Sequence, residues 1–107
     1  MAYQNPKKVK SPIGRITHLR VLYNGGEQVL DGPQGPWVGY SFAEAEWDEN
    51  PVSLFRWNGS DSSGYPNSRG IAMWVVIPPP FADAIREALK EAPPSAPDPI
   101  EEEEDEE

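Results

Sequence analysis

The sequence predicts a small α+β domain, in which one C-terminal helix packs on a face of an antiparallel sheet of four to five strands, connected mostly as a meander. Two observations support this prediction. Short runs rich in β-branched and aromatic residues are separated by turn signals, and the last run before the tail has helical rather than alternating periodicity. A small open barrel and a sheet packed on itself are the alternatives that this pattern leaves open.

Residues 16–23 form the first expected strand. The run is β-branched and partly alternating, which would place Leu19, Val21 and Tyr23 on one face. It ends at Asn24-Gly25-Gly26, a strong turn signal. The two glycines lack the following helix of a phosphate-binding motif.

The second and third expected strands cover residues 37–47 and 52–57. A four-residue turn over 48–51 would join them as a hairpin. Alanine and glutamate are weak strand formers, so a short helix over 42–47 is an alternative at this point.

Residues 71–77 are the most apolar run of the chain and predict a central strand buried on both faces. Three prolines over 78–80 end this strand, because proline cannot donate to a ladder. The spacing within 81–91 then predicts an amphipathic helix. Its apolar stripe would comprise Phe81, Ile85, Ala88 and Leu89.

Charge is unevenly distributed along the 107 residues, which carry nine basic and eighteen acidic side chains and a net charge of −9. Eight of the acids and none of the bases lie in 92–107, so the body is nearly neutral, unlike a typical nucleic-acid-binding domain. We therefore predict an irregular basic arm (1–14), a single α+β domain (15–91) and a disordered, proline-rich acidic tail (92–107).

The absence of cysteine excludes disulfides and thiolate metal sites, and it is compatible with a reducing compartment. No stretch approaches the roughly 18 apolar residues of a membrane span. No apolar run follows the first lysines, as it would in a secretory signal. We expect a small soluble chain in the cytoplasm, with no membrane partner.

The segment 58–70 is the most unusual part of the body, because thirteen residues without periodicity are a long connection for a small domain. Arg69 is its one cation and offers a planar fork to a carboxylate or phosphate. We interpret it as a binding loop; the alternative is a plain connection in which Arg69 pairs with Asp61. The candidate binding residues are Trp57, Asn58, Asp61, Tyr65, Asn67, Ser68 and Arg69.

Secondary candidates are Glu44 and Glu46, which would share one face of a strand, and Trp37. Two carboxylates about 7 Å apart can support acid–base chemistry, although the same pair is also typical of a solvated or edge strand. Trp37 is either an interface anchor or the first packed residue of its strand. His18 is the only histidine, so no metal site, cofactor or catalytic set is predicted.

The sequence favours a non-catalytic protein-interaction module, of the inhibitor or adaptor type, that uses the 58–70 segment and the acidic tail. The expected partner is a protein with a basic surface, which the tail would attract. The tail is otherwise a solubilising segment or folds back on Lys7, Lys8 and Lys10. The alternative function is a small polar or anionic ligand-binding domain, or a modest enzyme, with Arg69 as the anchor.

Overall fold

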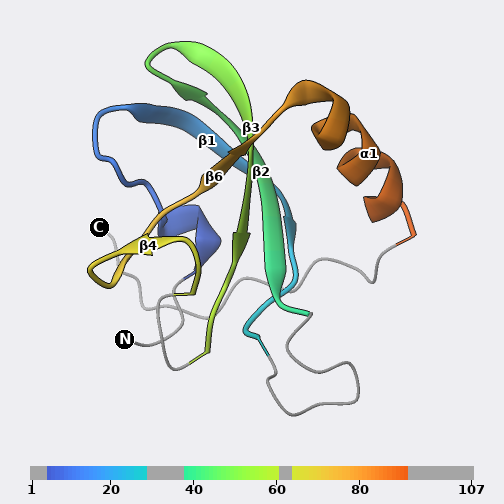
Figure 1. Ribbon diagram of the computed structural model, residues 1–107, viewed down its shortest axis with the longest axis horizontal. Coiled ribbons are helices and arrows are strands. Elements are labelled where there is room, and N and C mark those ends of the chain that lie inside the picture. Colours follow the sequence, from blue (N-terminus) through green and yellow to red (C-terminus); the bar gives the residue numbers. More distant parts are fainter. Residues whose placement is uncertain (1–4, 29–37, 61–63, 92–107) are drawn as a thin grey trace.

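The computed structural model describes residues 5–28, 38–60 and 64–91, and within them it confirms the α+β fold. Strands β1 (Ile16–Asn24), β2 (Tyr40–Trp47), β3 (Asn50–Trp57) and β6 (Val75–Ile77) form one antiparallel sheet in the order β1-β2-β3-β6. Figure 1 shows helix α1 (Pro79–Leu89) at one end of the view and the β4–β5 segment at the other, with the sheet between them. Strands β4 (Asn67–Ser68) and β5 (Ile71–Ala72) form a separate two-stranded pair, and a short 3-10 helix, η1 (Pro6–Lys8), precedes β1.

The β2–β3 hairpin is longer and tighter than the sequence predicts. Its ladder runs from Tyr40↔Trp57 to Trp47↔Asn50, so the turn consists of two residues rather than the expected four. Asp48 and Glu49 both have positive φ, at 51° and 71°, which is the geometry that matches the right-handed twist of paired strands. The helix considered for residues 42–47 is therefore wrong, because ladder pairing overrides the weak strand propensity of alanine and glutamate.

The carboxylate of Asp48 in this turn accepts hydrogen bonds from Arg15 Nε at 3.0 Å and Nη2 at 2.6 Å. These bonds lower the pKa of Asp48 below its ordinary value. A lowered folded-state pKa stabilises the fold above the unfolded-state value, about 3.9, and this contribution is lost as the pH falls through the folded pKa. We therefore expect Arg15→Gln to lower the urea midpoint near neutral pH, and the difference from wild type to narrow below about pH 4.

The control for this prediction is the same substitution in an Asp48→Asn background. In that background, the change in urea midpoint caused by Arg15→Gln should not depend on pH, because the titrating carboxylate of Asp48 is absent. Both side chains are about half exposed, so the effect is small. If the difference in urea midpoint between wild type and Arg15→Gln stayed constant from neutral to acidic pH, the lowered pKa of Asp48 would not result from Arg15.

The two faces of the sheet carry separate cores, because successive strand residues point to opposite sides. On one face, Ala43 and Leu54 pack with Val9 and Trp74, together with Ile16, Ala45 and Ala72. On the other face, Phe42 packs with Tyr23 and Ala82. Helix α1 therefore covers the second face, and the N-terminal arm and the segment after β5 cover the first.

Strand β1 changes which face its side chains reach. Its register with β2 shifts between Thr17 and Arg20 and again between Val21 and Tyr23. Val21 packs against the first core, whereas Tyr23 belongs to the core beneath α1. The prediction that Leu19, Val21 and Tyr23 share one face is therefore wrong for Tyr23, because an irregularity in the ladder reverses the alternation.

Helix α1 confirms half of the predicted stripe, Ile85 and Leu89, but packs Ala82 in place of Phe81 and Ala88. Ala82 is fully buried and Ile85 and Leu89 pack on the same core, whereas Phe81 is 65% exposed. Ala88 is also exposed. The buried set has the spacing i, i+3, i+7, which is as regular as the predicted one. The packed face was decided by the close approach of α1 to β3 and Phe42, which only a small side chain at position 82 permits.

Residues 71–77 are not a central strand, which corrects the strongest strand prediction. They divide into β5 and β6, and β6 lies at the edge of the sheet with Val75 and Val76 more than 40% exposed. The break occurs at Met73, whose N–H donates to the Pro66 carbonyl at 3.0 Å. Beside it, Trp74 Nε1 donates to the Val9 carbonyl at 2.6 Å. Met73 thus continues the pairing with the β4 side and Trp74 is held by the N-terminal arm, so the run does not form one strand of the main sheet.

Candidate functional site

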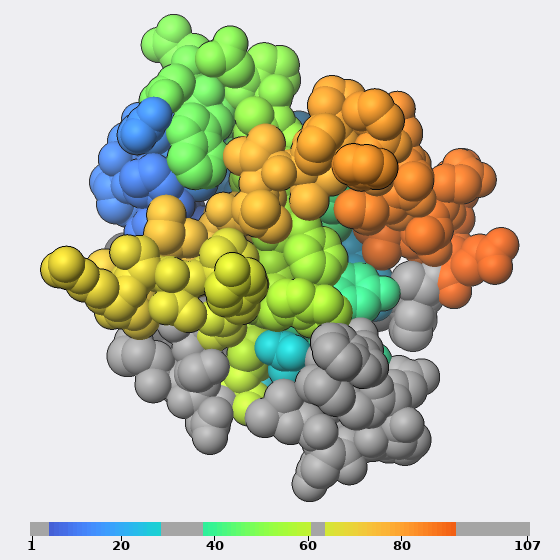
Figure 2. Space-filling view, in the orientation of Figure 1, coloured from blue at the N-terminus to red at the C-terminus, as the bar shows by residue number. Residues whose placement is uncertain are grey.

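The predicted binding segment is a pinned hairpin over the part that the structure describes, residues 58–60 and 64–70, and not a loop without structure. Trp57 and Tyr65 exchange backbone hydrogen bonds of 2.7 and 3.0 Å. Strands β4 and β5 follow, joined by Arg69 and Gly70 with φ of 54° and 83°. Figure 2 shows this yellow region projecting at the left edge of the molecule. The turn has the same two-residue geometry as the β2–β3 turn.

Arg56 on β3 anchors the base of this hairpin. It was not among the residues predicted from the sequence. Its side chain is fully buried, the largest of the fully buried side chains described. Nη1 donates to the carbonyl of Pro66 at 3.3 Å and to the carbonyl of Met73. A sequence signal existed, because Arg56 alternates with the buried Leu54 on β3 and so points to the same core. Hydrogen bonding to carbonyls on both sides of β4–β5 fixes the base of the hairpin.

The tip of the hairpin is exposed. Tyr65 is 69% and Ile71 58% exposed, and Ser68 and Arg69 are also exposed. Asn67 braces the tip, since its Nδ2 donates to the Gly64 carbonyl at 2.8 Å and its Oδ1 accepts from the Gly70 N–H at 3.3 Å. Among the residues described, Arg69 has no ion-pair partner.

Two of the predicted candidates, Asp61 and Trp37, lie outside the described residues. The suggested Arg69–Asp61 pair therefore stays a prediction. The same holds for the choice between packing and interface roles of Trp37.

Asn58 has a structural position instead of a ligand-facing one. It is fully buried, and its Nδ2 donates to the Gly26 carbonyl at 2.7 Å and to Asn24 Oδ1 at 3.3 Å. Its Oδ1 accepts from the hydroxyl of Ser41 at 2.9 Å. The network joins the end of β1, the start of β2 and the end of β3. Sequence reasoning missed this role because its partners lie up to 34 positions away.

Trp57 belongs to a row of aromatic rings on the face that carries α1. It meets Tyr40 and Phe55 edge-on, with ring centroids 5.7 and 5.4 Å apart. Tyr40 in turn lies 5.7 Å from Tyr23. Burial raises the pKa of the Tyr23 hydroxyl, with the Tyr40 hydroxyl as a second contribution. Trp57 thus pairs with Tyr65 through the backbone, while the Trp57 ring packs in this row.

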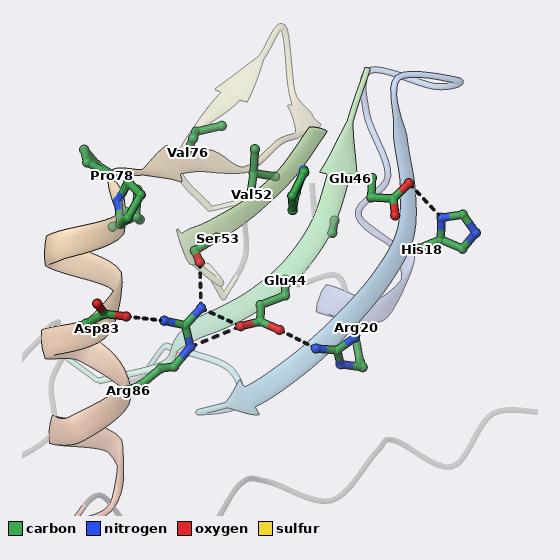
Figure 3. Close-up of a pocket in the computed structure, with 14 residues that line it drawn as sticks. His18, Arg20, Glu44, Glu46, Val52, Ser53, Val76, Pro78, Asp83 and Arg86 are labelled. Carbon is green, nitrogen blue, oxygen red and sulfur yellow. Dashed lines mark hydrogen bonds and ion pairs between the residues drawn. The ribbon is translucent and has the colours of Figure 1, made fainter. Parts of the chain in front are cut away.

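The secondary candidates Glu44 and Glu46 line a groove of about 570 Å³ between α1 and the β2–β3 hairpin. Figure 3 shows both side chains on the same side of β2, as the sequence predicts. Val76, Pro78 and Asp83 contribute to the opposite wall. The groove thus combines an apolar rim with acidic and basic groups.

Both carboxylate oxygens of Glu44 are engaged. One accepts from Arg20, and the other accepts from Arg86 Nη2 at 2.5 Å and Nε at 3.1 Å. Arg86 also donates to Ser53 Oγ at 3.0 Å and to Asp83 Oδ1 at 2.9 Å. The cluster fastens α1 to β2 and β3 (Figure 3), and it holds Glu44 as an ion-paired carboxylate.

Glu46 has a single partner on the neighbouring strand, His18. The distance from Glu46 Oε1 to His18 Nδ1 is 3.3 Å, and the histidine side chain is 78% exposed. The pair belongs to the open part of the groove. Within residues 5–28, 38–60 and 64–91, no group of three or more histidines and acids is arranged to hold a metal ion.

No protein-family model, curated protein or solved structure matches this chain. In the described segments no helix is long and apolar enough to cross a membrane.

Proposed function

We propose that the domain is a non-catalytic protein-interaction module whose β4–β5 hairpin contacts the partner. One observation carries the proposal: a hairpin fixed at its base by the buried Arg56 exposes Tyr65, Arg69 and Ile71 at its tip. Tyrosine and arginine are enriched among the residues that contribute most to protein–protein binding.

The fixed base of the hairpin supports a role in binding a partner, as opposed to a role as a plain solvated connection between strands. A segment that is already ordered loses less conformational entropy when a partner docks. Here the Asn67 side chain closes the tip, and the Trp57–Tyr65 backbone pair closes the entry. The exposed side chains therefore extend from a backbone that does not need to reorganise.

The acidic segment 92–107 lies outside the described residues, and its role in attracting a basic partner stays a prediction. Charge of one sign raises association rates with an opposite surface and makes them sensitive to salt. We expect the tail to affect the association rate and the hairpin to determine specificity.

The alternative, a small anionic ligand anchored by Arg69, is less well supported, because the three grooves found among the described residues lie elsewhere. The three grooves described are lined by residues from 7–21, 44–53 and 76–86, and none of them includes a residue from 57–70. Small-ligand sites are normally concave and bury most of the ligand, so an exposed hairpin tip suits a protein surface better.

The test uses three immobilised full-length baits in native cell extract, followed by quantitative mass spectrometry. The first is the wild type, the second carries Tyr65→Ser and Arg69→Ser, and the third carries Phe81→Ser and Lys90→Ser. The third is a matched control, because it also removes one exposed aromatic ring, on α1, and one exposed cation, at the C-cap of α1. All three should give the same far-ultraviolet spectrum and a cooperative urea transition.

We expect a stoichiometric partner that the wild type and the α1 variant retain, and that the hairpin variant loses by at least about tenfold, which corresponds to 1.4 kcal/mol. Equal capture by all three baits would remove the hairpin from the interface. If no bait retained a protein, the interaction module would be wrong, and the ligand alternative would be tested by thermal shift.

A further inference from the structure

A second surface of the molecule, which includes no residue of the β4–β5 hairpin, is a cationic groove beside β1. It has a volume of about 650 Å³ and is lined by residues of the N-terminal arm and of the edge strand. Lys7, Lys10 and Arg20 contribute charge, and His18 is the only other titratable side chain in the lining. The remaining lining residues are Ile16, Thr17, Leu19 and Val21. No acidic side chain lines this groove, in contrast to the two others described.

The lysines of this groove are held in place by the fold. Val9 between them is 1% exposed, and its carbonyl accepts the buried Trp74 Nε1 hydrogen bond at 2.6 Å. Asn5 caps η1 by accepting from the Lys7 N–H at 3.1 Å. Two exposed lysines, Lys7 and Lys10, therefore flank the buried Val9.

Arg20 forms the other wall of the groove. Its guanidinium bonds to Glu44 on the neighbouring strand β2, which holds it in place beside the groove. Strand β1 is the first strand in the sheet order, so its outer side pairs with no other strand of that sheet. Such an edge presents backbone N–H groups beside the cationic side chains.

We propose that this groove binds the chain's own acidic segment, residues 101–107. Every residue of that segment is an aspartate or glutamate, and it lies in a sixteen-residue stretch with no basic side chain. The lining of the groove has the opposite sign, so the two surfaces are complementary. The inference does not depend on the hairpin being a partner-binding surface.

The connection is long enough. Helix α1 ends at Leu89, and the proline-rich residues 92–100 precede the acids. An extended proline-rich chain advances about 3.1 Å per residue, so the spacer 92–100 carries the first acid about 28 Å and the acidic segment extends the reach to about 50 Å. The longest axis of the molecule is 39 Å.

The contact is electrostatic and reversible. Individual exposed ion pairs contribute little, but covalent attachment gives the tail an effective concentration of about millimolar at the groove. Screening at high salt shortens the range of the attraction to about 3 Å at 1 M. A basic partner would compete with the groove for the tail, so docking restrains the tail until such a partner arrives.

The test is paramagnetic relaxation enhancement on the full chain. Because the sequence contains no cysteine, Glu104→Cys provides a single attachment point for a nitroxide spin label. Amide signals of ¹⁵N-labelled protein are compared with the label oxidised and reduced. Two further proteins carry the label together with Lys7→Gln and Lys10→Gln, or with Lys90→Gln on α1 as the matched control.

We expect selective broadening of the amides of residues 7–10 and 16–21, which is lost at 1 M salt (a Debye length of about 3 Å) and in the Lys7→Gln/Lys10→Gln protein. The Lys90→Gln protein should broaden like the parent. Uniform weak broadening over the whole surface, strongest broadening elsewhere, or broadening unchanged by the two lysine substitutions would overturn the proposal. Broadening of ¹⁵N-labelled protein by added spin-labelled ¹⁴N protein would assign the groove to the tail of a second copy.

Discussion

Replacing Arg56 by methionine is expected to destabilise the domain by about 1 to 3 kcal/mol, because the Met73 carbonyl loses its Arg56 donor and the Pro66 carbonyl keeps only the Met73 N–H. The side chain is fully buried and donates to the carbonyls of Pro66 and Met73. Methionine keeps most of the aliphatic volume, so the loss measures hydrogen bonding and not a cavity. Urea unfolding followed by tryptophan fluorescence gives the difference in free energy of unfolding.

Two forces oppose each other at this position. Burying a guanidinium costs free energy, and replacing a buried ionic group by an apolar one is neutral or stabilising when its partners are replaced as well. Here the partners are backbone carbonyls, which no substitution of Arg56 removes. The cost of removing the Arg56 donor from the Met73 carbonyl, and one of two donors from the Pro66 carbonyl, therefore decides the sign.

The matched control is Arg20→Met, since that arginine lies on β1 with its side chain 67% exposed and has a single ion-pair partner described, Glu44. Arg20→Met should lower the free energy of unfolding by no more than about 1 kcal/mol. Hydrogen exchange adds a local measure: the amides of Tyr65 and Met73, which bond to Trp57 and Pro66, should exchange faster in Arg56→Met. Equal free energies for both variants, with unchanged exchange, would show that Arg56 does not hold the hairpin.

Replacing Asn58 by alanine is expected to cost about 2 to 4 kcal/mol, since the buried carboxamide joins three chain segments. The substitution removes the 2.7 Å bond that the side chain donates to the Gly26 carbonyl and the 2.9 Å bond that it accepts from the Ser41 hydroxyl. The backbone bond from the Asn58 N–H to the Gly39 carbonyl is retained in the variant, so the effect belongs to the side chain. Thermal and urea unfolding measure it.

A second asparagine supplies the control. Asn67 lies at the exposed tip of the β4–β5 hairpin, where its side chain bonds only to neighbours within three positions. Asn67→Ala should cost no more than about 1 kcal/mol. If instead Asn58→Ala folded as stably as wild type and only partner or ligand binding fell, Asn58 would be a binding residue as its sequence context suggests.

These two positions explain how the hairpin can serve as a recognition surface. Arg56 fixes the far side of the hairpin through Met73, and Asn58 fixes the strand end from which the segment departs. The exposed residues of the tip contribute little to stability, so Tyr65 and Arg69 can be substituted without unfolding the domain. Stability and recognition are thus separated within one short stretch of chain.

The sequence by itself determined the elements that depend on local pattern. Alternation and β-branching located β1 to β3, and proline followed by an amphipathic run located α1. Alternation also placed Glu44 and Glu46 on one side of β2. The same rule would have placed Arg56 inside, but an arginine at an inward position is easily assigned to the surface because charged residues are rarely buried.

The tertiary structure alone decided what those patterns could not distinguish. Residues 71–77 read as a buried strand, yet Trp74 bonds to Val9, 65 positions away, and the ladder stops at Met73. On α1, the stripe through Ala82 and the stripe through Phe81 are both regular, and only the approach of the sheet selects Ala82.

Asn58 reads as a loop residue until Asn24, Gly26 and Ser41 surround it. In each case the deciding contact joins segments far apart in the chain. A buried polar group takes whichever partner the fold brings near, and a local pattern carries no information on that partner.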